Sequence, residues 1–476
     1  MYNNANKNRI VVVSFKTKTM RIALLLSLVL FINELLAQMP NTLTKTEKVY
    51  GLSKFWQEVN YNFIYLDKID RDSWNEEYKR LITEVQETRD DYEYYRLLQK
   101  FCAMLKDGHT NVYEPDTIWN SLLNTNFGEY RLFLSNIEGK AIVTRTNLSK
   151  KDEIPIGTEI TKVNGLNTAT YLDQYVKPYI SSSTDHALDD WAVRNLFRAP
   201  SGKKYDVELK LPNGKIKALT LTHTKTTEKE VYPPFEQSPT LLDFKWVGKN
   251  IAYVSLNSFS DPKIDTLFIE KLPELYKAKS LVIDLRNNGG GNTFIGMDIL
   301  KYLTNDTILY GIKMRSRLHI PSYKAWGEWT EAKDTTGNNW EKQSFLSYRD
   351  KYYYDFEYEA DTISEKIQRI VVPTVLLIGH YTASAAEDFL IYADNQDHMV
   401  KIGEPTFGST GQPMQFDLPG GGSARVCTKK DTYPDGREFV GYGIQPDIIV
   451  RRTLNDYIDG NDPVLNKAIE YLKQKK

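Results

Sequence analysis

The sequence contains little of what marks a metal-binding or disulfide-stabilised protein. Among 476 residues there are two cysteines, Cys102 and Cys427, and six histidines. Two cysteines that lie far apart in the chain cannot form a disulfide framework or a four-ligand zinc site. A single bridge and two buried thiols both stay open, and we expect the free thiols. The length is too great for one compact core, so we expect two to four domains.

Neither sign of charge is in excess, and long apolar runs are scarce. Lys and Arg number 61 against 62 Asp and Glu, which gives no electrostatic case for nucleic acid or for an anionic membrane. The apolar run at residues 22–32 is short for a transmembrane helix. With Arg21 before it and Ala37 after it, residues 20–37 resemble a secretory signal peptide. We expect an exported protein, periplasmic or secreted, with no integral membrane span after signal removal; a buried N-terminal helix is the alternative.

The first part of the expected mature chain, residues 43–120, has the pattern of a helical domain. Leu52, Phe55 and Val59 fall on one face at helical spacing, and a second run of this kind ends at Gly108. His109 is then the first residue of a loop that a helix supports from behind.

Residues 125–225 change to short alternating strands, as expected of a small β domain. The stretch "IPIGTEITKVNG", residues 154–165, resembles a segment of PDZ domains. We therefore expect a PDZ-like β domain, a type of module that binds extended peptides, often by their C-termini, through strand addition. Any other small β domain is the alternative.

From residue 242 to about 455 strands alternate with helices, which predicts a largely parallel, buried sheet with its site at the carboxyl ends of the strands. Residues 305–365 have no clean period and predict an insertion or lid over that site. Residues 456–476 predict a C-terminal helix.

Two loops of this expected sheet have the composition of an acyl-transfer site. "DLRNNGGGN", residues 284–292, follows a buried strand and can present successive N–H groups to an anion, or form only a tight turn. Ser384 follows the run "VVPTVLLIGH" at the junction with a helix, either as a small packing residue or as a nucleophile near the positive helix end. His109 and His380 are both candidates for the base, and the spacing does not choose between them.

Six motifs together resemble, in order, the landmarks of the tail-specific, or C-terminal-processing, serine peptidases and their tricorn-type relatives. They are "KDGHT", "GTEITKVNG", "DLRNNGGG", "YTASAAE", "GEPTFGSTGQ" and "GYGIQPDIIV". The resemblance implies an α/β multidomain fold: an N-terminal helical segment, a PDZ-like β domain and a crotonase- or ClpP-like α/β catalytic core at residues 242–455.

The resemblance also assigns roles to individual residues. Ser384 takes the place of the nucleophile, and the N–H groups of Gly290 and Ala385 take the place of the oxyanion hole. Ser409 stands where one branch of the family has its lysine base, and Lys401, Lys429 and Lys430 do not fit that motif. The histidine branch matches "DGHT", which makes His109 the base and this chain closer to the tricorn type.

That branch also uses a late acidic residue, for which Glu438 is the expected match, with Asp435 and Glu387 as alternatives. Gly108 stands where the tricorn pattern has a serine. The implied function is an exported serine endopeptidase that needs no cofactor or metal. Its expected substrates are peptides or unfolded proteins, with binding by the C-terminus as one option. A catalytically inactive peptide-binding protein on this scaffold is the main alternative, and a CoA-dependent crotonase-like enzyme is a third.

Overall fold

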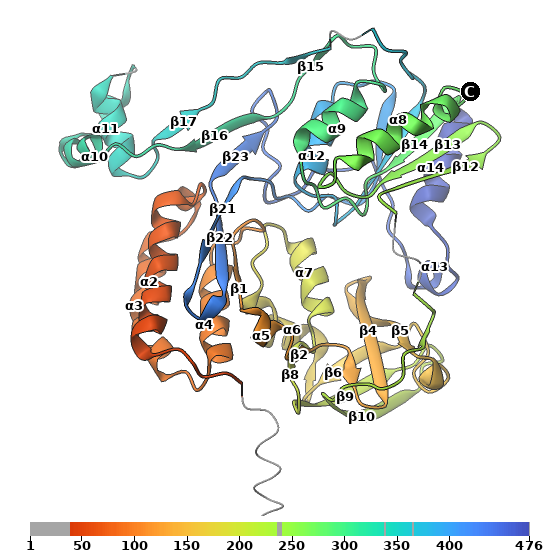
Figure 1. Ribbon diagram of the computed structural model, residues 1–476, viewed down its shortest axis with the longest axis horizontal. Helices are drawn as coiled ribbons and strands as arrows, with labels where there is room; N and C mark the ends of the chain where they lie inside the picture. Colours follow the sequence, from red (N-terminus) through yellow and green to blue (C-terminus); the bar gives the residue numbers. More distant parts are fainter. Residues whose placement is uncertain (1–38, 236–239, 338, 364–365, 476) are drawn as a thin grey trace, which may run out of the picture.

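The computed structural model describes residues 39–475 except 236–239, 338 and 364–365. The expected signal segment at residues 20–37 lies outside the described residues. The chain begins with three helices, α2 (Lys45–Asn62), α3 (Arg71–Glu84) and α4 (Asp91–Ala103) (Figure 1). Thr44, Asp70 and Asp90 cap their N-termini by accepting backbone N–H groups, which explains where each helix starts.

Aromatic side chains hold these helices together. Phe55, Trp74 and Phe101, one from each helix, are buried in contact, and the rings of Trp74 and Phe101 stack at 3.7 Å between centroids. The packed bundle gives α4 a fixed position, and the loop that carries His109 leaves from its end.

A second unit is an antiparallel sheet in the order β10-β9-β6-β5-β4-β3, with β7 beside β6 and β11 beside β5. Helices α6 (Thr168–Tyr175) and α7 (Asp185–Arg194) belong to this unit, which has a hydrophobic core of its own. The strands are β3 (Asn126–Phe127), β4 (Tyr130–Ile137), β5 (Lys140–Asn147), β6 (Glu159–Val163), β7 (Leu166–Asn167), β9 (Lys204–Lys210), β10 (Ile216–Thr222) and β11 (Val231–Tyr232).

The third unit contains a six-stranded sheet in the order β12-β13-β14-β19-β20-β24, parallel except for the edge strand β12. Its strands are β12 (Leu242–Gly248), β13 (Ile251–Leu256), β14 (Ser280–Asp284), β19 (Thr374–Ile378), β20 (Met399–Gly403) and β24 (Ile448–Ile449). Because β14 and β19 are neighbours and parallel, the loops after Asp284 and Ile378 leave the sheet side by side.

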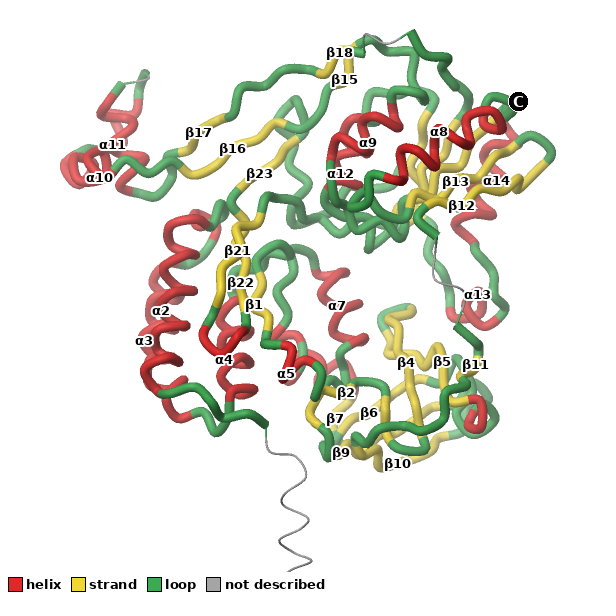
Figure 2. The backbone as a smooth tube through the Cα atoms, in the orientation of Figure 1, coloured by secondary structure: helices red, strands yellow, loops and turns green. Residues whose placement is uncertain are grey.

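Helices cover both faces of this sheet (Figure 2). The helices α8 (Lys263–Leu275), α9 (Thr293–Leu300) and α12 (Ala385–Tyr392) pack on Ile283 and Leu376, whereas α14 (Pro463–Gln474) packs on Val282 and Leu377. Alternate residues of each buried strand therefore face opposite helical layers, as the period of a strand requires.

A small sheet joins the helical segment to this core. Strand β1 (Asn111–Tyr113) pairs with β22 (Ser423–Cys427), which pairs with β21 (Pro413–Asp417). The hydroxyl of Thr110 also accepts the backbone N–H of Cys427 at 3.0 Å. This pairing places the loop before β1, with His109, against the third unit. Cys102 and Cys427 are both free and buried.

The described residues between 305 and 363 form an arm and not the expected lid. Strand β16 (Lys313–Arg317) pairs with β17 (Tyr353–Asp355) and with β23 (Lys429–Thr432), and this ribbon carries α10 (Pro321–Trp326) and α11 (Trp340–Tyr348) away from the sheet (Figure 1). The arm docks on the N-terminal helices, where Arg71 pairs with Asp350 at 2.9 Å. Short elements complete the described chain: α5 (Asp116–Trp119), β2 (Leu122–Leu123), β8 (Ala199–Pro200), β15 (Ile308–Leu309), β18 (Asp361–Thr362) and α13 (Leu454–Ile458).

None of the helices in the described ranges combines the length and the apolar character that a membrane crossing requires.

The cover that α14 gives to the central sheet predicts a stability effect. Leu472 is 2% exposed and packs on the sheet, so Leu472→Ala should lower the free energy of unfolding by about 2–4 kcal/mol through lost burial and a residual cavity. Urea denaturation followed by circular dichroism measures the change, with the exposed Lys473→Ala as control. Equal stabilities of the two variants would contradict this packing.

Candidate active site

Ser384 lies in a sharp turn between the buried strand β19 and the helix α12. It has φ 55° and ψ −124°, a left-handed conformation that is costly for a residue with a side chain. Gly290 lies directly against this turn, because a Cβ atom there would come within 2.7 Å of the Ser384 Cβ. The Ala383 N–H donates to the Asn288 carbonyl at 3.0 Å, which ties the serine turn to the glycine loop. The two loops that the sequence marked are thus in contact.

His109 and Ser384 line the same cavity, which has a volume of about 1050 Å³. The Nδ1 atom of His109 is 2.7 Å from the hydroxyl of Ser409. Within the described chain this is the one hydrogen bond of the imidazole, so Nε2 has no protein partner. Burial, together with the positive charges of Arg425 and Lys429, lowers the pKa of His109 to about 4. The imidazole is therefore neutral at physiological pH. In the tautomer that donates its Nδ1–H to the Ser409 oxygen, Nε2 is the nitrogen that can accept a proton.

A buried carboxyl group, Glu387, links the serine turn to the loop that holds Ser409. Its Oε2 accepts the N–H groups of Ser384 at 3.0 Å and Ser409 at 3.2 Å. Its Oε1 accepts the N–H of Gly408 at 2.8 Å and the hydroxyl of Thr406. Burial raises the pKa of Glu387 to about 8, and these hydrogen bonds oppose that rise. The carboxyl group fixes the relative positions of Ser384 and Ser409.

The N–H groups expected to form an oxyanion hole are only partly free. The N–H of Ala385 has no hydrogen-bond partner among the described residues, as an oxyanion donor requires. The N–H of Gly290 donates to the side chain of Asn288 at 2.9 Å, and Asn288 is itself fixed by its bond to the Leu256 carbonyl at 3.0 Å. Gly289 and Gly291, but not Gly290, line the cavity.

The structure does not bring Glu438 to this site. Glu438 pairs with Lys68 and Lys430 and is absent from the lining of the cavity. Its neighbour Asp435 pairs with Arg437 at 2.7 Å. The alternative acid, Glu387, lies in the first turn after Ser384 and is the carboxyl group that contacts the serine turn.

Ser409 is the functional residue whose role the sequence did not reveal. Its place in the "TFGSTG" motif, where related chains have lysine, was the available signal, but only the fold shows that its hydroxyl reaches His109. The lysines considered as bases are engaged elsewhere: Lys401 with Asp394 at 3.3 Å, Lys429 with Asp431 at 3.1 Å and Lys430 with Glu438. None of these lysines lines the cavity.

His380, the other candidate base, lies outside the cavity lining, although it is only four residues before Ser384. Its Nδ1 pairs with Asp190 of α7 at 2.7 Å, and its ring packs on His186 at 4.5 Å between centroids. His380 thus joins the core to the second unit and has no contact with the serine hydroxyl.

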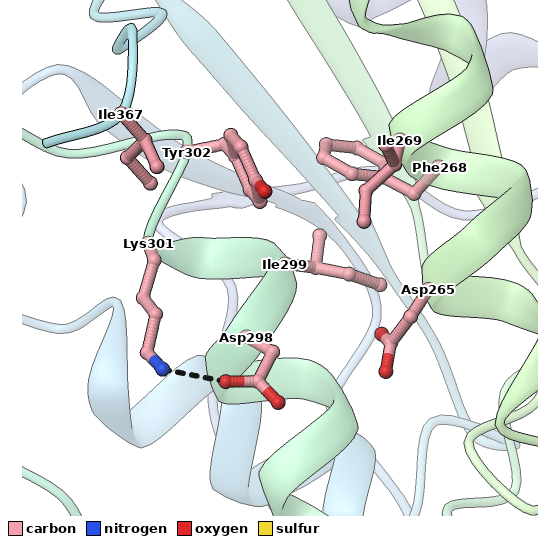
Figure 3. Close-up of a pocket in the computed structure, with 8 residues that line it drawn as sticks. All are labelled: Asp265, Phe268, Ile269, Asp298, Ile299, Lys301, Tyr302 and Ile367. Carbon is pink, nitrogen blue, oxygen red and sulfur yellow. Dashed lines mark hydrogen bonds and ion pairs between the residues drawn. The ribbon is translucent and has the colours of Figure 1, made fainter. Parts of the chain in front are cut away.

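A second, smaller cavity of about 210 Å³ lies between α8 and α9 (Figure 3). Asp265, Asp298 and Tyr302 are among the residues that line it, and Lys301 pairs with Asp298 at 2.6 Å. None of the residues that the sequence marked for catalysis lines this cavity.

Comparison with known proteins finds a family match in the part of the chain that carries Ser384. Residues 250–450 match the model of peptidase family S41. The core of this chain is therefore similar to family S41. This family and the carboxyl-terminal-processing relatives make the chain a serine-type peptidase.

Two similar curated proteins match over most of their length. A carboxyl-terminal-processing protease of Picosynechococcus sp. is 23% identical over 432 residues, 90% of this chain and 89% of the relative. One from Synechocystis sp. is 24% identical over 437 residues, 90% of this chain and 87% of the relative. Among solved structures, mature CPAF complexed with lactacystin has a TM-score of 0.62 at 16% identity, covering 90% of this chain and 97% of that one. The chain therefore shares the overall fold of CPAF.

The hydrogen bond from Ser409 to His109 predicts a kinetic effect. Ser409→Ala should leave the imidazole free to rotate and lower kcat by roughly 10–100-fold with little change in KM, because the hydroxyl touches the base and not the substrate. Steady-state kinetics on a quenched peptide measures the split. Ser409→Thr keeps the hydroxyl and should recover much of the loss; equal defects in both variants would show that the hydroxyl does not position His109.

The low pKa of His109 predicts an acid limb of activity far below the ordinary histidine range. An imidazole with the usual pKa would place the rise of kcat/KM between about pH 6 and 7. Since the pKa in the folded state is about 4, we expect kcat/KM to stay constant as the pH is lowered to about 5 and to fall near pH 4. In the unfolded chain His109 binds its proton from about pH 6.5 downward, whereas in the folded chain it does so only near pH 4. The stability of the fold therefore also decreases as the pH falls from about 6.5 to about 4. A limb at pH 6–7 would contradict this assignment.

Proposed function

We propose that this chain is an exported serine endopeptidase in which Ser384 is the nucleophile and His109 the general base. The observation that carries the proposal is the bond between His109 Nδ1 and Ser409, 2.7 Å long, in the cavity that Ser384 also lines. We assign the tautomer in which Nδ1–H donates to the Ser409 oxygen, which leaves Nε2 to take the Ser384 proton. Residues 20–37 support export.

The mechanism follows the chemistry of acyl transfer. His109 Nε2 takes the proton of the Ser384 hydroxyl while Oγ forms a bond to the peptide carbonyl carbon. The N–H of Ala385 and an N–H of the glycine run 289–291 stabilise the oxyanion; if the second donor is Gly290, its N–H must exchange its bond with Asn288. The imidazolium then gives its proton to the leaving amine, and water, activated by the same imidazole, hydrolyses the acyl-enzyme.

The acid of this site is proposed to be Glu387, acting through the loop of Ser409. Glu387 accepts the N–H of Ser384, the proposed nucleophile, and the N–H of Ser409, whose hydroxyl contacts His109. Glu387 is therefore a positioning residue, and Glu438 has no part in the reaction.

The substrates proposed are peptides or unfolded proteins. The names of the carboxyl-terminal-processing relatives support cleavage near a C-terminus. The antiparallel sheet at residues 125–225, with α6 and α7 packed on it, supports a PDZ-like module that presents an edge to an extended peptide.

Hydrolysis by Ser384 is tested with the wild-type chain, Ser384→Ala and His109→Ala on unfolded casein, with a fluorophosphonate probe alongside. We expect the wild type to label and to cleave, and both variants to lose activity by at least about a thousandfold at unchanged folding. Glu438→Gln, which breaks an exposed ion pair, should keep activity within about threefold. Peptide binding without labelling or cleavage by the wild type would instead indicate the inactive peptide-binding protein.

A further inference from the structure

The large cavity extends well beyond the catalytic residues and has an aromatic wall. Besides Ser384 and His109, it is lined from α4, β1, α5, α6 and α7. Four of its large side chains are exposed in the free protein: Tyr113 at 39%, Trp119 at 51%, Tyr175 at 54% and Trp191 at 38%. Such rings gathered in one hollow favour a ligand with apolar or aromatic side chains.

The charge of this lining is positive although the chain as a whole is balanced at −1. The charged side chains of the lining, apart from the neutral His109, are four arginines and one acid: Arg96, Arg194, Arg198, Arg425 and Glu114. Glu114 pairs with Arg198 at 2.5 Å. Among the described residues, Arg96, Arg194 and Arg425 make no ion pair, so the cavity keeps an excess of three positive charges.

These three guanidinium groups are held in place by neutral contacts. Arg194 lies over the ring of Tyr381 at 4.4 Å, and Arg96 lies over Tyr179 at 3.6 Å. Arg425 donates to the Asn111 side chain at 2.8 Å and to the Gly108 carbonyl at 3.2 Å. Stacking fixes the plane of a guanidinium while its N–H groups stay available to a carboxylate.

Two of these arginines contact residues that are near Ser384 or His109 in the sequence. Tyr381, under Arg194, is three residues before Ser384, and Gly108, bound by Arg425, directly precedes His109. A substrate whose scissile bond lies at Ser384 therefore places neighbouring residues within the field of these charges.

We propose that the cavity selects substrate segments that carry a carboxylate beside an aromatic or large apolar residue, with Arg96, Arg194 and Arg425 as the carboxylate-binding side chains. This inference rests on the proposed function, because it names the substrates of that same site. The carboxylate has two possible sources, an Asp or Glu side chain and the free C-terminus of the substrate, and both present the same chemistry to an arginine.

A binding experiment tests the inference without turnover. The full-length Ser384→Ala chain is titrated, at low and at high salt, with four fluorescent peptides of one apolar sequence that contain Glu or Gln and end in a free carboxylate or an amide. We expect peptides with a carboxylate to bind at least about tenfold more tightly than the Gln amide, with less difference at high salt. A loss of affinity on replacing Glu by Gln would show that the cavity binds a side-chain carboxylate. A loss of affinity on amidation would show that it binds the C-terminal carboxylate. Equal affinity for all four peptides would overturn the proposal.

Variants then identify the residues. Arg194→Gln should reduce the preference for the carboxylate peptide by roughly tenfold, and Arg194→Lys should keep part of it because the charge remains. Arg96→Gln and Arg425→Gln are measured in the same way. Arg349→Gln is the matched control, since Arg349 also lies on an aromatic ring, Phe345 at 3.6 Å, but outside the cavity. If none of the three cavity variants changes the preference, or if Arg349→Gln changes it equally, the assignment is wrong.

The same peptides separate this inference from the proposed function. Cleavage that depends on Ser384 but ignores the carboxylate would overturn the inference and leave the peptidase intact. Selective binding with no cleavage by the wild type would overturn the peptidase and leave the carboxylate site intact.

Discussion

One buried carboxyl group, Glu387, holds the turn of Ser384 and the loop of Ser409 in their positions. An ionisable side chain that is fully buried is costly unless its hydrogen-bonding capacity is filled. Glu387 fills it with the N–H groups of Ser384, Gly408 and Ser409 and the hydroxyl of Thr406. Any movement of the serine turn relative to the loop 406–409 would therefore leave a buried acceptor without its donor, so the two segments are held as one unit.

His109 reaches this unit from a distant part of the chain. Pairing of β1 with β22 sets the position of the loop before β1. The second unit, the antiparallel sheet with α6 and α7, also forms hydrogen bonds with that loop. The hydroxyl of Ser183 accepts the N–H of Gly108 at 2.9 Å, and Ser181 donates to the Asp107 carbonyl at 2.8 Å. The site is thus assembled from three units, and the cavity between them takes its arginines from all three. Positioning of the base and selection of the substrate share the same interfaces.

Much of this arrangement was predictable from local sequence. The buried strand before Ser384, the glycine run after Asp284 and the loop of His109 all follow from residue pattern, because each depends on neighbours in the chain. The choice of His109 over His380 needed the resemblance to a family, since Asp190, which engages His380, comes from a helix far away in the sequence.

The remaining features depend on contacts that no spacing reveals. In the sequence Glu387 is indistinguishable from any acidic residue in the first turn of a helix. Only the folded structure shows its hydrogen bonds with residues 406–409. Glu438 has the expected spacing but lies beside Lys68 and Lys430. The irregular pattern of residues 305–365 predicts a lid, because it does not show that Asp350 contacts Arg71 of the N-terminal helices.

A crystal structure of the wild-type chain with a phosphonate bonded to Ser384 tests the central claim most directly. The account predicts that His109 Nε2 lies within about 3.5 Å of the modified Oγ, that Nδ1 keeps its bond to Ser409, and that the Ala385 N–H donates to a phosphonyl oxygen. A structure with His109 more than about 10 Å from Ser384, or with a lysine amine at the adduct, would contradict it.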